Sequence, residues 1–346
     1  MNAAEKFDSA VAMYLQNLRM GGKSEATVRN YASRLALFRE FWTEHADAAP
    51  TADPDYAVVL SWRDALLHAG RQPSTVRQYL KELSFFFSAF RKPIFGRELQ
   101  YPENPVDEEF YPKTEKRPYD VILTDTEVLR LTVNECPLPQ LKPMWARNYA
   151  LTAILLTSQI RNAELLDLRP SDLDFENGEL AVERGKGNKY RRVQFTPFAQ
   201  SAVRLYLASG IRPAALPSDA PLFGTTAAHE FGVCPAKNDG EKWHRGSSQW
   251  LSSLIERHVK TVTGVANVRT HDLRHVGSRI LLNAGASMEF VQAELGHASF
   301  ATTQLYCGRL LQRRGQNSAR AVLAAMSDEA ERNDRLYRLT VPSAAV

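Results

Sequence analysis

Six side chains between residues 161 and 306 carry the functional groups needed to break a phosphodiester. They are two guanidinium groups, an amine, two imidazoles and a phenol, on Arg161, Lys186, His271, Arg274, His297 and Tyr306. Attack on phosphorus builds a five-coordinate centre with extra negative charge, which fixed cations and hydrogen-bond donors stabilise when no metal takes part. The set therefore predicts phosphoryl transfer with a tyrosine nucleophile.

Each of these side chains suits one part of such a reaction. A guanidinium grips two phosphate oxygens at once, so Arg161 and Arg274 are candidates to hold the non-bridging oxygens. A tyrosine with its ordinary pKa of about 10 needs a nearby base or positive charge, and His271 and His297 are the candidate helpers. The leaving 5′ oxygen needs a proton, which Lys186 on a turn can supply.

The spacing of these residues predicts the helices that present them. His271 and Arg274 are three residues apart, so a helix near 271–283 places both on one face. A second helix near 287–295 ends at Gly296, which turns His297 inward. A third short helix is expected near 300–310, around Tyr306.

A small sheet is expected to carry the lysine. Residues 173–175, 179–184 and 190–195 have the pattern of short strands, and Asn177-Gly178 is a strong hairpin turn between the first two. The turn between the second and third strands spans 185–189 and contains Lys186. Upstream, an apolar run over 149–156 predicts a buried helix that leads into Arg161.

The first hundred or so residues predict a small bundle of helices. Ser24 and Ser74 are candidate caps of two helices with apolar faces. Prolines and acidic residues between 93 and 118 then suggest an extended linker. We therefore expect domains at 1–112 and 113–346, the second opening with a helix capped by Thr124. An amphipathic tail helix is expected over about 316–340.

The bulk properties are compatible with a nucleic-acid partner. The 346 residues suit about two domains, and the pI near 8.9 with a net charge of +4 is mildly basic. Three widely spaced cysteines form no disulfide framework, and neither a secretory signal nor a membrane span is visible. We expect a cytoplasmic protein. Candidate phosphate contacts, whose alternative role is solvent-facing charge, are Arg29, Arg77, Lys81, Lys189 and Arg191.

In the order and separation of these segments the chain resembles the tyrosine recombinases, also called phage integrases, and especially their Xer-like members. The matching stretches are 157–169, 182–193, 270–285 and 294–306. The resemblance implies a mainly α protein: a helical, SAM-like core-binding domain, then an α+β catalytic domain with a small three-stranded antiparallel sheet. It further implies site-specific recombination of double-stranded DNA without ATP, metal or other cofactor.

The same resemblance assigns the roles. Arg161 and Arg274 activate the scissile phosphate, Lys186 protonates the leaving 5′ hydroxyl, and His271 transfers protons. His297 hydrogen-bonds the phosphate, and Tyr306 forms a 3′-phosphotyrosyl link. It also implies a tetramer on two DNA sites that is associated with the nucleoid, and a C-terminal helix passed to a neighbouring subunit.

Several positions depart from the family pattern. The family usually has Thr-Gly-Leu-Arg or Thr-Gly-Met-Arg at the first arginine, whereas Gln159 here replaces a small residue by a larger one. Val276-Gly277 stands where Thr or Ser is common, and Cys307 follows the tyrosine. A long loop is expected near 225–247. Its His229, Cys234 and His244 suggest zinc, but no Cys-x-x-Cys pair supports a metal site.

Two other functions are compatible with the same segments. One is a DNA-binding accessory protein that has lost catalysis, against which the complete set of six side chains argues. The other is an enzyme that nicks and reseals one duplex, like the type IB topoisomerases. The separate helical first domain and the Leu295-Gly296-His297 segment favour recombination.

Overall fold

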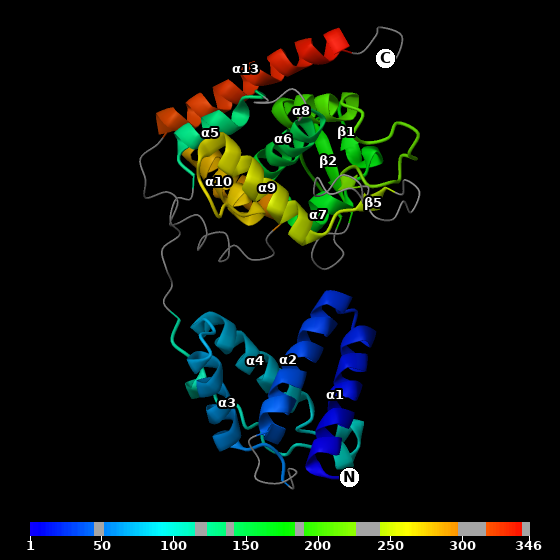
Figure 1. Ribbon diagram of the computed structural model, residues 1–346, viewed down its shortest axis with the longest axis vertical. Coiled ribbons are helices and arrows are strands. Elements are labelled where there is room, and N and C mark those ends of the chain that lie inside the picture. The colour runs from blue at the N-terminus through cyan, green and yellow to red at the C-terminus, as the bar shows by residue number, and fades with distance from the viewer. Residues whose placement is uncertain are drawn as a thin grey trace. The chain divides into compact units, whose positions relative to one another are not determined.

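The structure is a computed structural model that describes residues 1–44, 52–114, 123–135, 142–183, 190–225, 243–296 and 316–340 (Figure 1). The chain forms two compact units, Met1–Arg117 and Pro118–Val346. Each unit has a hydrophobic core of its own. Within the described residues, no helix is long and apolar enough to cross a membrane.

The first unit is a helix bundle, as the sequence predicted, and its described residues form four α-helices. The helices are α1 (Ala3–Met20), α2 (Glu25–Glu44), α3 (Tyr56–His68) and α4 (Pro73–Ala89). Ser24 accepts a hydrogen bond from the Thr27 backbone N–H at 3.2 Å, in agreement with its expected capping role. The prediction for Ser74 was wrong, because α4 begins one residue earlier at Pro73, with Gln72 at the cap position. Proline suits a first helical position, since it lacks the N–H that would be unpaired there.

The proline-rich segment after α4 is not an extended linker over 93–110. It forms three short 3-10 turns, η1 (Pro93–Phe95), η2 (Arg97–Leu99) and η3 (Glu108–Phe110). Leu99, Tyr101 and Val106 are buried in the first unit's aromatic core. The apolar residues between the prolines therefore fold this segment back onto the bundle, because their burial outweighs the preference of proline for an extended chain.

The second unit is mainly helical with a three-stranded antiparallel sheet, as expected. Strands β1 (Leu173–Asp174), β2 (Glu179–Val182) and β3 (Arg191–Gln194) lie in that order, with Leu180 opposite Val193. Gly178 has φ +68° in the predicted hairpin turn. A second ribbon, which sequence reasoning missed, pairs β4 (Gly224–Thr225) with β5 (His244–Arg245). Residues 226–242 of the expected long loop, including His229 and Cys234, lie outside the described residues.

A central helix of this unit is α6 (Lys142–Thr157), which packs against several of the others. The others are α5 (Asp125–Thr132), α7 (Asn162–Asp167), α8 (Pro197–Ala208), α9 (Ser248–Thr263), α10 (Thr270–Ala284), α11 (Met288–Leu295) and α13 (Gln316–Thr340), with the turn η5 (Pro170–Asp172) before the sheet. Thr124 caps α5 through a reciprocal bond with Glu127, as predicted.

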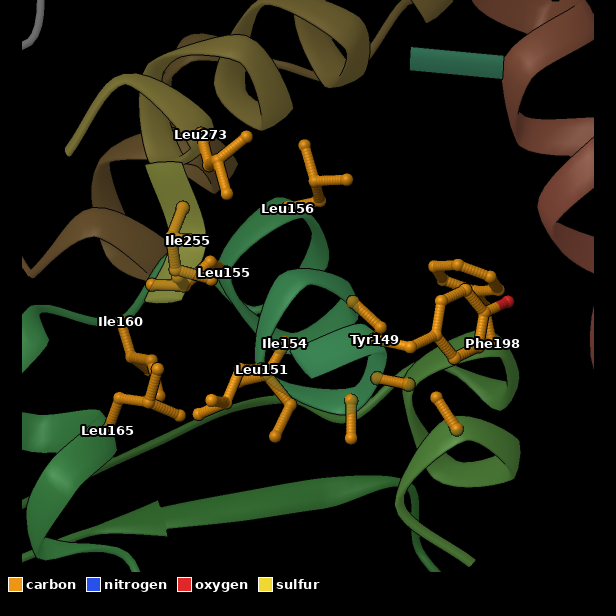
Figure 2. Close-up of a cluster of buried hydrophobic side chains, with 14 of the residues drawn as sticks. Tyr149, Leu151, Ile154, Leu155, Leu156, Ile160, Leu165, Phe198, Ile255 and Leu273 are labelled. Atoms are coloured by element: carbon orange, nitrogen blue, oxygen red, sulfur yellow. The ribbon is translucent and has the colours of Figure 1, made fainter. Parts of the chain in front are cut away.

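Helix α6 is the buried helix that precedes Arg161. Its side chains from Tyr149 to Leu156 are buried on every side, as expected of a helix that is apolar all round (Figure 2). Ile255 of α9 and Leu273 of α10 lie against one end of it, and Phe198 of α8 against the other (Figure 2). The buried helix therefore fixes the point at which the chain emerges toward Arg161.

Helix α13 packs on its own unit, against α5, α8 and α10 (Figure 1). Val322 and Met326 are buried and Leu323 is partly buried, so the predicted apolar face is confirmed. Polar groups also take part: Glu329 accepts a 3.0 Å bond from the Asn134 N–H. Asn333 is wholly buried, and its Nδ2 lies 3.3 Å from the Tyr149 hydroxyl and 3.4 Å from that of Ser201.

Candidate active site

The structure describes three of the six predicted catalytic residues and brings them together. These are Arg161, at the start of α7, and His271 and Arg274, on the first turns of α10. The other three, Lys186, His297 and Tyr306, lie outside the described residues, as do Lys189 and Cys307.

Arg161 is fixed by both its backbone and its side chain. It occupies the cap position of α7, where its N–H donates to Glu164 Oε2 at 2.7 Å and its Nη1 to Glu164 Oε1 at 2.8 Å. Its Nη2 donates to the carbonyl oxygens of Leu295 at 3.3 Å and Gly296 at 3.1 Å. About a quarter of the side chain, 28%, remains exposed, so a ligand can still reach it.

Arg274 donates to the same Leu295 carbonyl oxygen as Arg161. Its Nη2 donates to the Leu295 carbonyl at 2.6 Å, and its side chain is almost wholly buried. The last carbonyls of a helix have no partner within the helix and carry the negative end of its dipole, so cations are favoured there. The C-terminal end of α11 thus gathers two guanidinium groups next to residue 297.

Glu164 is a site residue that sequence reasoning missed. Its carboxylate is buried and accepts from Arg191 Nη1 at 2.9 Å and Nη2 at 2.8 Å, in addition to its bonds with Arg161. Burial opposes its ionisation, but the hydrogen bonds from Arg191 and Arg161 outweigh burial and lower its pKa to about 2. The signal in the sequence was its position three residues after a helix-capping Arg161.

Arg191 and Gly296 bring the sheet against the end of α11. Gly296 has φ +59°, and a Cβ placed there would lie 3.0 Å from Arg191 Nε and 3.1 Å from its Cζ. A second link is the bond from the Gln194 N–H to the buried Glu294 carboxylate, at 3.1 Å. Strand β3 begins five residues after Lys186 and is thereby tied to α11, which ends two residues before His297. Arg191 thus has a structural role, while its predicted DNA contact stays a prediction.

His271 is exposed and lies at the edge of this cluster. Its ring stands perpendicular to that of His275, with centroids 4.5 Å apart. Desolvation by the surrounding protein lowers the pKa of the imidazole, and the charges of Arg274 and Arg161 lower it further, whereas the charge of Asp272 raises it. A pKa below the ordinary value of about 6.5 leaves the imidazole neutral near pH 7, where it can accept a proton.

The predicted DNA contacts of the first unit lie on α2 and α4. Arg29 is exposed, while Arg77 and Lys81 are partly buried. The Arg77 guanidinium lies over the Tyr111 ring at 5.1 Å and donates to the Pro112 carbonyl at 3.4 Å. These roles stay predictions. In the described part of the chain, no group of three or more His, Cys, Asp or Glu residues is placed to hold a metal ion.

Known proteins resemble the chain over most of its length. Residues 122–312 match the phage integrase family. The tyrosine recombinase XerC of Oceanobacillus iheyensis is 31% identical over 307 residues, which cover 88% of the chain and 92% of that relative. The XerC of Mycobacterium sp. strain KMS is 29% identical over 286 residues, which cover 82% of the chain and 88% of the relative.

Two solved structures share the fold at low sequence identity. The Tn1549 transposon integrase in complex with transposon right end DNA has a TM-score of 0.62 at 18% identity, covering 94% of this chain and 100% of its own. The XerH site-specific recombinase bound to difH substrate in a pre-cleavage complex has a TM-score of 0.60 at 20% identity, covering 88% of this chain and 82% of its own.

Proposed function

Because the chain belongs to the phage integrase family, we propose that its six predicted side chains break and rejoin DNA through a phosphotyrosine. The protein is a tyrosine site-specific recombinase. The observation that best supports the assignment of roles is the meeting of Arg161 and Arg274 at the Leu295 carbonyl, two residues before His297.

In the proposed cleavage step, the Tyr306 oxygen attacks the scissile phosphorus. A P–O bond forms to the phenol, the bond to the 5′ oxygen breaks, and Lys186 gives that oxygen a proton. His271, held neutral by its surroundings, accepts the phenolic proton. Arg161 and Arg274 bind the non-bridging oxygens, where the extra negative charge develops. His297 donates a further hydrogen bond to the phosphate.

Rejoining reverses these bonds with a different strand. The 3′-phosphotyrosyl ester keeps the energy of the broken phosphodiester, so the 5′ hydroxyl of a partner duplex can attack it and release Tyr306. ATP is not needed for this exchange, because no net bond energy is lost, and a metal is not needed because the two arginines stabilise the charge on the phosphate. The alternatives, a silent DNA-binding protein and a type IB topoisomerase, are not favoured, since the relatives that match 88% and 82% of the chain are tyrosine recombinases.

The partner is double-stranded DNA carrying a specific site. The Tn1549 integrase and XerH are described as DNA complexes, which supports this partner for the chain. We place Arg29, Arg77, Lys81, Lys189 and Arg191 at DNA phosphates, the first three on the core-binding domain at 1–112. Self-association to a tetramer on two sites, with exchange of helix α13, completes the proposed complex. It acts in the cytoplasm, on the nucleoid.

A nicked duplex tests this function. If the nick lies just 3′ of the scissile phosphate on the same strand, the short fragment bearing the 5′ hydroxyl diffuses away, and the covalent adduct accumulates. The wild-type chain should form this adduct and then join a second duplex that supplies a 5′ hydroxyl. Tyr306→Phe should bind DNA equally well and form no adduct. An adduct in the Tyr306→Phe protein would place the nucleophile elsewhere, and an adduct without joining would favour the topoisomerase.

A further inference from the structure

Gln159 occupies a backbone conformation that its side chain disfavours. Its φ is +52°, in the left-handed region that is strained for residues other than glycine. Among the described residues the only other non-glycine position with positive φ is Asn267, a residue type that tolerates this region. The Gln159 side chain is also wholly buried, two residues before Arg161. A strained, buried residue at this position needs a specific set of contacts to hold it.

Those contacts connect the end of α6 to α10. Gln159 Nε2 donates to the Leu156 carbonyl at 3.1 Å, and Gln159 Oε1 accepts from the Ser278 hydroxyl at 2.8 Å. The same hydroxyl lies 3.0 Å from the carbonyl oxygen of Arg274. A continuous path of buried polar contacts therefore runs from the segment before Arg161 to the backbone of Arg274.

Gly277 provides the space for this arrangement. A Cβ at that position would lie 1.9 Å from the Leu156 carbonyl oxygen and 2.4 Å from Gln159 Nε2. Those distances are far inside van der Waals contact, so the backbone of α10 passes directly beneath the amide and the end of α6. The large side chain at 159 and the missing side chain at 277 are complementary in shape.

We propose that Gln159 is a positioning residue that sets the distance between the two arginines at the scissile phosphate. Its amide ties the chain before Arg161 to the turn of α10 that follows Arg274, so both guanidinium groups reach the Leu295 carbonyl. The inference rests on the proposed function, because it assumes that these arginines bind the phosphate. It adds a residue whose amide is hydrogen-bonded to Leu156 and Ser278.

Gln159→Gly is the first variant, because it removes the amide and relieves the backbone strain at once. The melting temperature and DNA affinity of the full chain should stay close to those of the wild type. Adduct formation on the nicked duplex, measured in a single turnover, should fall at least about tenfold, since small displacements of a positioning group are costly. Unchanged adduct formation would overturn the inference.

Ser278→Ala tests whether the two residues act as a unit. It removes the α10 hydroxyl that donates to Gln159 Oε1, so the single variant should also be slow. In the Gln159→Gly background the same change should have little further effect on the rate, because the link is already broken. If the rate of the double variant falls by the product of the two single-variant decreases, the two residues act separately, contrary to the proposal.

A substrate with a neutral scissile phosphate separates positioning from general damage to the fold. Replacing one non-bridging oxygen by a methyl group removes the charge that the two guanidinium groups meet. The deficit of Gln159→Gly relative to wild type should then shrink to about twofold, since misplaced cations matter less. An equal deficit on both substrates would overturn the inference and leave the proposed function standing. No adduct from the wild-type chain would overturn both.

Discussion

Arg191 and Glu164, which are 27 residues apart in the chain, form a two-point ion pair with N–O distances of 2.9 and 2.8 Å. The same carboxylate holds the backbone N–H and Nη1 of Arg161. One buried acid therefore links the sheet to a predicted catalytic arginine. Removing one partner of a buried ion pair leaves the other charge buried without compensation, so this link can be tested by removing the charge of Glu164.

Glu164→Gln should destabilise the second unit and slow cleavage. The neutral amide of glutamine cannot balance the charges of the Arg161 and Arg191 guanidinium groups. Loss of one partner of a buried ion pair lowers the free energy of unfolding by roughly 3 to 5 kcal/mol. Urea unfolding of the full chain measures this cost, with Glu256→Gln, an exposed change on α9, as the control. Equal stability of the two variants at pH 7 would contradict the role assigned to Glu164.

The contribution of Glu164 should also depend on pH in a defined direction. Its pKa is lowered from 4.5 to about 2 in the folded protein, so its stabilising effect is complete above pH 4.5 and is lost as the pH falls toward 2. The stability difference between wild type and Glu164→Gln should therefore shrink between pH 5 and pH 3. A difference that grows on acidification would have the wrong sign.

Arg161→Lys should preserve DNA binding but lower cleavage by about a hundredfold, the usual effect of losing one donor to a developing anion. A lysine amine cannot bind Glu164 and the carbonyls of residues 295 and 296 with the fixed geometry of a planar fork. The nicked-duplex assay gives the rate. Arg192→Lys, an exposed change on β3, is the matched control and should cleave normally.

Gly296→Ala should impair cleavage more than Gly285→Ala does. Both glycines end helices with positive φ, so both changes strain the backbone. At Gly285 an added Cβ meets nothing within 4 Å, whereas at Gly296 it presses on Arg191. The extra loss of adduct formation in Gly296→Ala measures the contact between β3 and α11. Identical rates for the two variants would show that the contact is unimportant.

Cleavage should lose activity on the acid side with a midpoint below pH 6.5. His271 has a lowered pKa, and its neutral form is the one that accepts a proton, so the rate should rise as pH increases through that pKa. In single-turnover measurements, His271→Asn should cleave slowly and lose this acid limb. An acid limb that is unaltered in His271→Asn would assign the titration to another group.

DNA affinity should fall steeply with salt, because each phosphate contact releases counterions. Arg29→Ala should weaken binding to all sequences alike and reduce the slope of log affinity against log salt by about 1. Arg19→Ala removes a cation that is paired with Glu25 at 3.2 Å and should leave the slope unchanged. A slope that is the same for Arg29→Ala and wild type would remove Arg29 from the interface.

The local features of this fold could be predicted because local forces determine them. The predicted apolar face of α4 is buried at Val76, Leu80, Leu83 and Phe86, and the Asn177-Gly178 turn joins β1 to β2. The amphipathic tail and the helices around His271 and before His297 were likewise predicted within a few residues. In these cases periodicity, capping and turn chemistry all favour the same structure.

The contacts that organise the site could not be predicted, because they join distant segments. Nothing near Gln159 in the sequence indicates Ser278, which is 119 residues away, and Glu164 alone does not indicate Arg191. The departures at 159 and 277 were visible separately, but their complementary shapes appear only once α6 packs on α10. Likewise, the prolines after α4 predicted an extended segment, whereas Leu99, Tyr101 and Val106 are buried because the rest of the bundle packs on them.

The polar contacts between α13 and the rest of its unit allow the helix to pack in one register. Asn333 lies over two hydroxyl groups, and Glu329, one turn earlier, meets a backbone N–H. Sliding the helix by a single position would leave these buried polar groups without their partners, at a free-energy cost that apolar contacts alone would not impose. If helix α13 of another copy docked here, it would have to adopt the same register. The polar groups of Asn333 and Glu329 would then fix that register for either copy.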